Sequence, residues 1–453
     1  MPAPMRPWTG RAQVAPTSEI EAGHRAGGAH PYDWTMPVYV DHAATTPISA
    51  PALAALTREL SRRGNPSSLH GSGRRARRSV EDAREVLAAA AGAHPSEVIF
   101  TSGGTEADNL AIKGLYWARR AADPARTRII CSSIEHHAVQ DTVQWLEQHE
   151  GAEVVWVPVD GSGVVSLDGL RAALEVAPGR TALVTVMWAN NEVGTVQPVH
   201  EVVAEAARYE VPVHSDAVQA FGSLPVSFAE SGLATMAISA HKIGGPVGVG
   251  ALLVGRAVTL TPVQHGGGQE RDIRSGTLDG AGIAAFAAAA GDVVARLPVE
   301  GVRLAGLRDR LIEGVLREVP EAVLRGVAHP APEGTRLPGN AHFTFPGCEG
   351  DSLLFLLDLA GIESSTGSAC TAGVPRPSHV LLAMGLTEDQ ARGAQRFSLG
   401  HTSTDGDVDS VVKAIGGAHG RARAAGMAGH ASSIRTAGTG FTTRRDDAGM
   451  RSV

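Results

Sequence analysis

Short β-rich runs alternate with helical stretches through most of this chain, and that alternation limits the folds it can adopt. Between residues 97 and 254 these runs are "EVIFTS", "RIICSS", "AEVVWVPV", "TALVTVMW", "VPVHSD", "MAISA" and "VGALLV". Helical stretches such as "VHEVVAEAARYE" separate several of them. Strands that alternate with helices form a mostly parallel sheet with helices on both faces. The pattern therefore predicts an α/β fold.

The pattern changes after about residue 297, where helices and strands of a smaller α+β domain are predicted. The expected organisation is a large domain at 49–297, a small domain at 298–424, and a segment at 37–48 that joins the small domain. Residues 1–36 and 425–453 are rich in small and polar residues without periodicity, and we expect them to be disordered tails.

Composition argues against several classes of function. A net charge of −7 does not favour nucleic-acid binding, and in the arginine-rich stretch 74–87 the spacing of Arg77 and Glu81 predicts a salt-bridged helix face instead. The longest apolar run, 281–291, is too short to cross a membrane, and the N-terminus lacks the pattern of a signal peptide. Three cysteines without a CxxC pair fit a reducing compartment, so we expect a cytoplasmic location.

Lysine is scarce, and this singles out one residue for chemistry. The chain contains only Lys113, Lys242 and Lys413. Arginine can replace lysine on a solvated surface, but not where an amine must lose its proton to act as a nucleophile. Lys242 follows a short strand and precedes "IGGPVGVG", where a half-buried amine would have a lowered pKa and could form a Schiff base. Lys113 and Lys413 lie in predicted helices and are better explained as solvated side chains.

Two motifs could bind a ligand beside Lys242. In "IFTSGGTEADN" a strand runs into Gly103–Thr105 and a helix opens at once, so free backbone N–H groups could bind a phosphate. The alternative is a capping turn in which Thr105 pairs with Asp108. Asp216 ends the strand "VPVHSD" at the sheet edge where ligands bind, and could either pair with a protonated ring nitrogen or cap the next helix. Glycine turn, aspartate and lysine together match the groups that bind pyridoxal phosphate.

Other motifs could complete such a site. "IEHHAV" places His136 and His137 after a strand, where one of them could lie on a cofactor ring; metal binding is not expected, because no ligand cluster stands nearby. Asn191 in "WANNEVG" suits a hydrogen bond to a cofactor hydroxyl. Thr277 ends the glycine-rich "HGGGQERDIRSGT", which is either a phosphate-covering segment or a surface loop. Arg396 could pair bidentately with a substrate carboxylate.

Cys370 stands in "STGSACTAG", a stretch that offers little to bury a thiol. Free cysteines are among the most buried side chains, and an exposed one is more often explained by its reactivity than by packing. Its flanking residues Gly367 and Gly373 would suit a segment that moves between a pocket and a partner surface.

The motifs taken in order resemble those of the cysteine desulfurases of the iron–sulfur-cluster type. The resemblance runs from about Val38 to Ala425 and rests on "YVDHAATTP", "GNPSSLH", "FTSGGTEADNLAIKG", "EHHAV", "WANNEVGTVQP", "HSDAVQA", "SAHKIGGPVGVGAL", "HGGGQERDIRSGT", "STGSACTAG" and "RFSLGHT". These enzymes belong to the class V aminotransferase group of fold-type I pyridoxal-phosphate enzymes. The resemblance therefore implies a large domain with a mostly parallel seven-stranded sheet and a smaller α+β domain.

The resemblance also implies roles for individual residues. Lys242 would hold the cofactor and later remove the substrate α-proton, His136 would stack on the ring, and Cys370 would be the nucleophile. The implied cofactor-binding residues are Gly104, Thr105, Asn191, Asp216, Gln219, Ser239, His241, Lys242 and Thr277, the last from the other subunit of a homodimer. Asn65 and Arg396 would hold the substrate carboxylate.

The implied reaction converts L-cysteine to L-alanine and leaves a persulfide on Cys370, which a sulfur-acceptor or iron–sulfur scaffold protein would collect. A selenocysteine lyase or an aminotransferase on the same fold is the alternative, and so is a desulfurase that serves tRNA thiolation or DNA sulfur modification. The sequence does not identify the acceptor. Neither nucleic acid nor membrane is expected as a partner.

Overall fold

The fold is seen in a computed structural model that describes residues 37–367 and 377–424. Both predicted tails and Cys370 lie outside these described residues. All the elements named below belong to the compact unit that begins at Val38.

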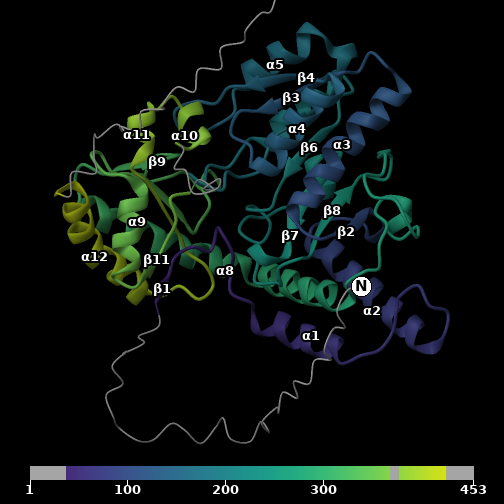
Figure 1. Cartoon of the computed structure of the whole chain (residues 1–453), viewed down its shortest axis with the longest axis horizontal. Helices are drawn as coiled ribbons and strands as arrows, with labels where there is room; N and C mark the ends of the chain where they lie inside the picture. Colours follow the sequence, from purple (N-terminus) through teal and green to yellow (C-terminus); the bar gives the residue numbers. More distant parts are fainter. Residues whose placement is uncertain (1–36, 368–376, 425–453) are drawn as a thin grey trace, which may run out of the picture. The chain divides into compact units, whose positions relative to one another are not determined.

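A seven-stranded sheet forms the centre of the larger part, with the order β2-β8-β7-β6-β5-β3-β4 (Figure 1). The strands are β2 (Val98–Thr101), β3 (Arg128–Ser132), β4 (Glu153–Val157), β5 (Thr181–Thr185), β6 (Val213–Asp216), β7 (Thr235–Ser239) and β8 (Gly250–Val254). Only β8 runs antiparallel to its neighbours; the other adjacent pairs are parallel. The predicted α/β fold with a mostly parallel seven-stranded sheet is therefore confirmed.

Helices cover both faces of this sheet because its central strands are apolar on both sides. Neighbouring residues of β3 show the arrangement: Ile129 packs in a core with α3 and α4, and Ile130 packs in a core with α2, α5, α6 and α8. The helices of this part are α1 (Ala50–Leu60), α2 (Gly71–Ala90), α3 (Gly104–Ala122), α4 (His137–Glu150), α5 (Leu167–Val176), α6 (Val199–Ala207), α7 (Phe228–Ser231) and α8 (Gly280–Glu318). Strands buried on both faces are typical of parallel sheets.

A second core lies around a three-stranded antiparallel sheet with the order β12-β10-β9. Its strands are β9 (Val323–Arg325), β10 (Asn340–Thr344) and β12 (Ala394–Ser398). Helices α9 (Gly350–Asp358) and α12 (Asp405–Ala424) pack in this core, whereas α10 (His379–Ala383) and α11 (Glu388–Arg392) pack in a separate cluster with Met187 and Val193. Near the start of the described residues, β1 (Val38–Tyr39) pairs in parallel with β11 (Ile362–Glu363).

Helix α8 contributes to both cores. Ile283 and Phe286 pack with α1 and α2 in the larger core, and Leu311 packs with α12 in the smaller one. The helix contains Pro298 and runs through residue 297, where the sequence predicts the domain boundary. Among the described residues it is the one helix long and apolar enough to cross a membrane. In this structure it is a core helix that links two packed units.

A buried ion pair fixes the segment that precedes α8. Arg84 of α2 donates from Nη2 to Glu270 Oε1 at 2.6 Å and from Nη1 to Glu270 Oε2 at 2.9 Å, and Glu270 Oε2 also accepts from Phe100 N at 2.7 Å. Glu81, which the sequence pairs with Arg77, bonds to Arg84 instead, at 3.1 Å. That expectation was therefore wrong, because Arg84 lies on the buried side of α2.

We predict that Glu270→Ala lowers the free energy of unfolding by about 3–5 kcal/mol, because it leaves the Arg84 charge buried without a partner. Denaturant unfolding followed by circular dichroism measures the change. Glu205→Ala, which removes ion pairs with the solvent-accessible side chains of Arg171 and Arg208, serves as the control and should change the curve little. Equal midpoints for the parent and Glu270→Ala would contradict this account of the pair.

Candidate active site

The carboxyl edge of the central sheet brings the predicted site residues together. Asp216 ends β6, and Lys242 lies in the 3-10 turn Ala240–Lys242 that follows β7. His136 follows β3, and Asn191 lies beyond the end of β5. The glycine turn before α3 follows β2, which runs in the same direction as β7. Chain segments far apart in sequence therefore reach one place through sheet topology.

The glycine turn has the features of an anion site. Gly103 is the N-cap of α3 with a φ of 152°, and no side chain caps the free N–H groups of the first turn. A Cβ on Gly104 would lie 2.7 Å from Val218 Cγ2, so the turn can pack closely only with glycine. The buried Ser239 Oγ has no hydrogen-bond partner among the described residues. The turn and this hydroxyl would suit a phosphate.

The alternative capping box does not form. Helix α3 begins at Gly104, so Thr105 lies inside the helix and is not its N-cap. Asp108 is buried and contacts His214 Nε2 at 3.2 Å through its Oδ1. The Ser102 N–H donates a hydrogen bond to Glu106 Oε2 at 2.7 Å. Asp108 thus belongs to the interior behind the site rather than to the phosphate turn.

Lys242 is a partly buried lysine with its amine held by backbone carbonyls. Its Nζ donates to Ala43 O at 2.6 Å and to Ala44 O at 2.8 Å. Burial and, to a smaller extent, the Arg396 guanidinium lower the pKa of Lys242 to about 8, against the opposite effect of Asp216 and Asp41. A substantial fraction of the amine is therefore neutral near physiological pH, as a nucleophile or base requires.

Asp216 is buried, and the more exposed His136 and the partly buried Lys242 lie close enough to influence its pKa. Burial raises the pKa of Asp216, and His136 and Lys242 oppose that rise. Asp216 Oδ1 accepts from Val218 N at 2.9 Å, so the carboxylate also braces the next turn. His136 is the N-cap of α4, with Nδ1 accepting from Ala138 N at 3.1 Å, and burial lowers its pKa. His136 therefore caps α4, and its role on a cofactor ring stays a prediction.

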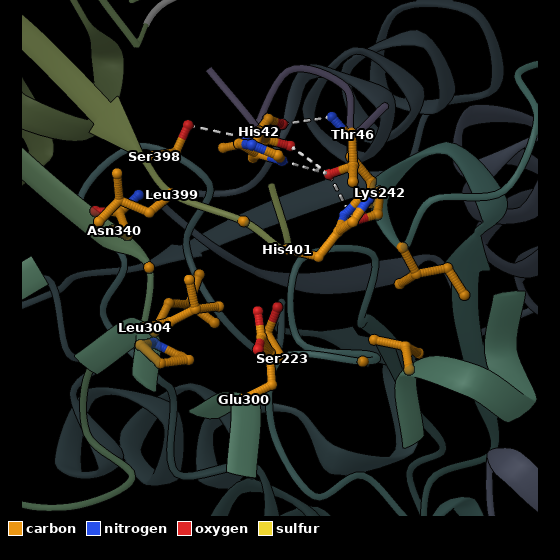
Figure 2. A pocket seen from close by; sticks show the side chains of 18 of the residues that line it. His42, Thr46, Ser223, Lys242, Glu300, Leu304, Asn340, Ser398, Leu399 and His401 are labelled. Carbon is orange, nitrogen blue, oxygen red and sulfur yellow. Dashed lines mark hydrogen bonds between the residues drawn. The ribbon is translucent and has the colours of Figure 1, made fainter. Parts of the chain in front are cut away.

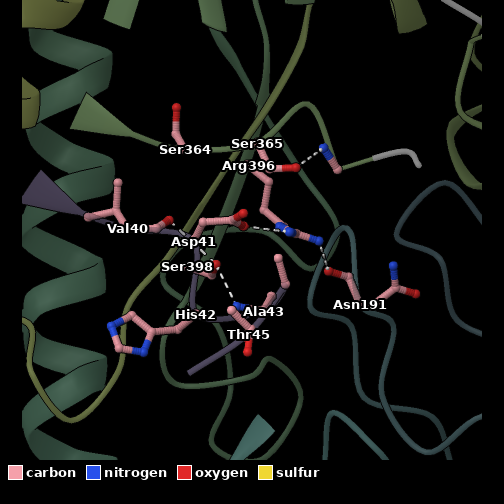
Figure 3. Close-up of polar contacts among 12 residues, drawn as sticks. Val40, Asp41, His42, Ala43, Thr45, Asn191, Ser364, Ser365, Arg396 and Ser398 are labelled. Atoms are coloured by element: carbon pink, nitrogen blue, oxygen red, sulfur yellow. Dashed lines mark hydrogen bonds and ion pairs between the residues drawn. The ribbon is translucent and has the colours of Figure 1, made fainter. Parts of the chain in front are cut away.

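Arg396 of β12 enters the site from the second core (Figure 3). Its Nη2 donates to Asp41 Oδ1 at 2.7 Å and its Nη1 to Asn191 O at 2.9 Å. The side chain is buried, and its Nε has no partner among the described residues. A substrate carboxylate would therefore approach a guanidinium that Asp41 and the Asn191 carbonyl already orient.

The remaining predicted residues divide into two groups. Gln219 Nε2 donates to Ala43 O at 3.0 Å, and His241 Nδ1 lies 3.3 Å from Thr45 Oγ1, with its pKa lowered by burial to about 4. Both therefore line the Lys242 region. Asn65 and Thr277 are exposed, and within the described ranges no hydrogen bond joins either to the other site residues. Cys370 lies outside the described residues.

Two hollows adjoin the site. A cavity of about 90 Å³ lies beside Lys242, lined by side chains that include His42, Glu300 and His401 (Figure 2). A more open groove of about 420 Å³ runs past Thr105 and His136. Lys113 lines that groove with its Nζ 4.6 Å from the centre of the Trp145 ring, and burial lowers its pKa. Lys113 is therefore only partly exposed, whereas the sequence predicts a solvated side chain.

Several polar residues of the site were not expected from the sequence. Glu135 is buried behind the site, accepts from Ser132 Oγ at 2.5 Å, and has its pKa raised to about 8 by burial. His214 could have been found, because it stands two residues before Asp216 in β6 and so faces the same side of the sheet. The carbonyls of Ala43 and Ala44 carry no side-chain signal, so sequence reasoning could not place them.

Comparisons with known proteins show the family to which the chain belongs. Residues 38–411 match the family described as Aminotransferase class-V. The chain is 57% identical to an IscS-like cysteine desulfurase of Mycobacterium tuberculosis over 390 residues, which cover 86% of this chain and 98% of that one. A solved structure of a NifS-like protein matches with a TM-score of 0.76 and 36% identity, covering 84% and 99% of the two chains. A structure described as SspA in complex with cysteine matches with a TM-score of 0.68 and 33% identity, covering 80% and 98%.

The lowered pKa of Lys242 predicts how the reactivity of its amine depends on pH. In the cofactor-free protein, labelling of Lys242 by an amine reagent should rise as pH increases through about 8, because only the neutral amine reacts. The Arg396→Leu variant should move this midpoint upward, since it removes a nearby positive charge. Peptide mass spectrometry can follow each lysine separately, with Lys413 as the internal reference. A midpoint that Arg396→Leu leaves in place would contradict the electrostatic link.

Proposed function

The chain belongs to the aminotransferase class-V family, and we propose on that basis that it is a pyridoxal-phosphate-dependent cysteine desulfurase. The observation that carries this proposal is the meeting of a lysine of lowered pKa, a buried aspartate and an uncapped glycine turn at one sheet edge. The similarity to cysteine desulfurases over most of the chain supports the same substrate, L-cysteine.

The residues present fit the cofactor. Gly104 and Thr105 begin α3 with free N–H groups, and the Ser239 hydroxyl is buried without a partner, so a phosphate would satisfy both. Asp216 would face the pyridine nitrogen, and Lys242 would hold the aldehyde carbon through its amine. When bound, the cofactor supplies an electron sink for the carbon that loses its proton.

The chain's own groups then have distinct tasks. Arg396, oriented by Asp41 and Asn191, binds the carboxylate of L-cysteine. Lys242 Nζ takes the α-proton, a task for which a pKa of about 8 is suitable. His136, whose Nδ1 is occupied by the Ala138 N–H, leaves Nε2 as the ring nitrogen that can exchange a proton.

Sulfur transfer is assigned to Cys370 from the sequence. Its thiolate attacks the substrate sulfur, the bond between that sulfur and the substrate Cβ breaks, and the electron pair stays with carbon. Protonation of that carbon and return of a proton from Lys242 to the α-carbon give L-alanine, and Cys370 carries the persulfide. An acceptor protein, for iron–sulfur assembly or for thiolation, would then take the sulfur.

We also propose a homodimer in which Thr277 acts on the partner's cofactor. Thr277 is exposed and lies in the segment that Glu270 anchors, without a hydrogen bond to its own site among the described residues. The cytoplasmic location stays a prediction. Selenocysteine lyase and aminotransferase activities are not favoured by the relatives, and product analysis with cysteine, selenocysteine and a keto acid would separate them.

Cys370→Ala should abolish alanine and persulfide formation from L-cysteine while the protein keeps its bound cofactor, because Lys242 and Asp216 are unchanged. Amino-acid analysis and the cofactor absorbance measure the two effects. Cys348→Ala, which removes a buried cysteine, is the matched control and should retain the reaction. Full alanine production by Cys370→Ala would refute the nucleophile assignment.

Mixed dimers can test the role of Thr277. Thr277→Ala alone should weaken cofactor affinity by about tenfold or more, as expected for one hydrogen bond to a charged group. A mixed dimer of one Thr277→Ala protomer and one Lys242→Ala protomer should contain one normal site. That site combines Lys242 of the Thr277→Ala protomer with Thr277 of the Lys242→Ala protomer. Cofactor titration of the mixed dimer measures this restoration. If Thr277 serves its own protomer, no normal site appears.

A further inference from the structure

Glu192 is a buried carboxylate to which the proposed chemistry gives no task. It lies in the turn after Asn190, and only 3% of its surface is exposed. Burial raises its pKa, while Ser378, His379 and Arg396 lower it. A buried carboxylate is costly unless it is hydrogen-bonded, so its partners indicate what it does.

Its side-chain partner stands at one end of the segment that carries the nucleophile. Glu192 Oε2 accepts from Ser378 Oγ at 2.5 Å, and Ser378 is itself buried. The Ser378 hydroxyl also accepts from Leu381 N at 3.2 Å and so caps α10. Ser378 follows Cys370 by eight residues. The Glu192–Ser378 bond therefore holds the residue at which α10 begins.

The other end of the segment lies against the same residue. A Cβ on Gly367 would be 3.7 Å from Glu192 Cβ and 3.1 Å from His342 Nε2, and the φ of Gly367 is +88°. Cys370 follows Gly367 by three residues, a length that spans at most about 11 Å. The position of this end relative to the site therefore limits where the thiol can reach.

The turn that carries Glu192 also contacts the substrate-binding arginine. Asn191 O accepts from Arg396 Nη1 at 2.9 Å, and Glu192 O accepts from Asn340 Nδ2 at 3.1 Å. Asn190 Oδ1 holds the turn by accepting from Glu192 N and Val193 N, both at 2.9 Å. One turn thus bonds to Arg396 and to Ser378 and lies close to Gly367, and the last two residues stand on either side of Cys370 in the sequence.

We propose that Glu192 is a positioning residue, which holds Ser378 and the end at Gly367 so that Cys370 can reach the sulfur of a substrate bound by Arg396. The proposal rests on the desulfurase function proposed above. It assigns Glu192 no contact with substrate or cofactor. Its effect is on the geometry of sulfur transfer and not on cofactor or substrate binding.

Three variants of the full-length, cofactor-loaded protein separate these effects. Glu192→Ala removes the acceptor, Ser378→Ala removes the donor, and Glu192→Gln keeps an oxygen that can accept from Ser378. Thr387→Ala is the matched control, because Thr387 caps the neighbouring helix α11 with its hydroxyl but has no carboxylate contact. Each protein is mixed with L-cysteine. The cofactor absorbance change reports substrate binding, and quenched-flow mass spectrometry reports persulfide on Cys370.

Glu192→Ala and Ser378→Ala should slow persulfide formation about 10- to 100-fold, the scale of effect expected from a displaced reacting group. The cysteine concentration that gives half of the absorbance change should stay near the parent value. Glu192→Gln and Thr387→Ala should react at rates close to the parent. This split between binding and transfer, with rescue by the glutamine variant, is not expected of a residue that only stabilises the fold.

Other outcomes would overturn the proposal. Persulfide formation at the parent rate in both Glu192→Ala and Ser378→Ala would exclude positioning through this bond. A parallel loss of cofactor absorbance, substrate binding and persulfide in all Glu192 variants would make the residue merely structural. If the parent itself makes neither alanine nor persulfide from L-cysteine, the proposed function fails and the positioning role falls with it. An active parent with an equally active Glu192→Ala overturns the positioning role alone.

Discussion

The carboxyl edge of one parallel sheet is the constraint on which the rest of this structure depends. Strands β3, β5, β6 and β7 run in one direction, so the residues that follow each of them meet at the same edge. Residues separated by more than a hundred positions, such as His136 and Lys242, thereby lie close enough for their charges to interact. The antiparallel strand β8 lies between β7 and β2, so β2 runs in the same direction as β7. The glycine turn that follows β2 therefore lies at the same edge. The site follows from strand direction, and the individual side chains supply its chemistry.

Burial of several charges in one place determines how the site can react. Desolvation is the largest influence on both Lys242 and Asp216, and it acts in opposite directions: it lowers the pKa of the lysine and raises that of the aspartate. Each residue partly offsets the effect on the other, since opposite charges favour each other's ionised forms. Arg396 adds a second cation, but Asp41 bonds to it directly and limits its effect. The result is an amine that can lose its proton beside a carboxylate that can hold a charge.

Much of this arrangement could be predicted from the sequence, and the remainder depends on contacts that sequence patterns do not record. The strands were recognisable because parallel strands are apolar runs, and Lys242 and Asp216 because they follow such runs. The Asp41–Arg396 pair could not be foreseen, since it joins residues from opposite ends of the chain. The partial burial of Lys113 was not foreseen, because helical spacing does not show that Trp145 of α4 lies beside it. The sequence pattern paired Glu81 with Arg77, whereas the structure pairs Glu81 with Arg84. Both arginines lie about one helical turn from Glu81 along α2, so spacing alone did not distinguish them.

The segment from Asp41 to Thr46 explains how two packed cores make one site. Asp41 binds Arg396 of β12, and Ala43 N donates to Ser398 Oγ at 2.9 Å, so the segment is held by the second core. Its carbonyls at Ala43 and Ala44 accept from Lys242, which belongs to the central sheet. If the amine of Lys242 held the proposed cofactor, it could no longer donate to both of these carbonyls as it does here. The same segment orients Arg396 through Asp41, so a change at Lys242 would act on the segment that holds the arginine. The lysine and the arginine are thus joined through backbone groups of residues 43 and 44 and the side chain of Asp41.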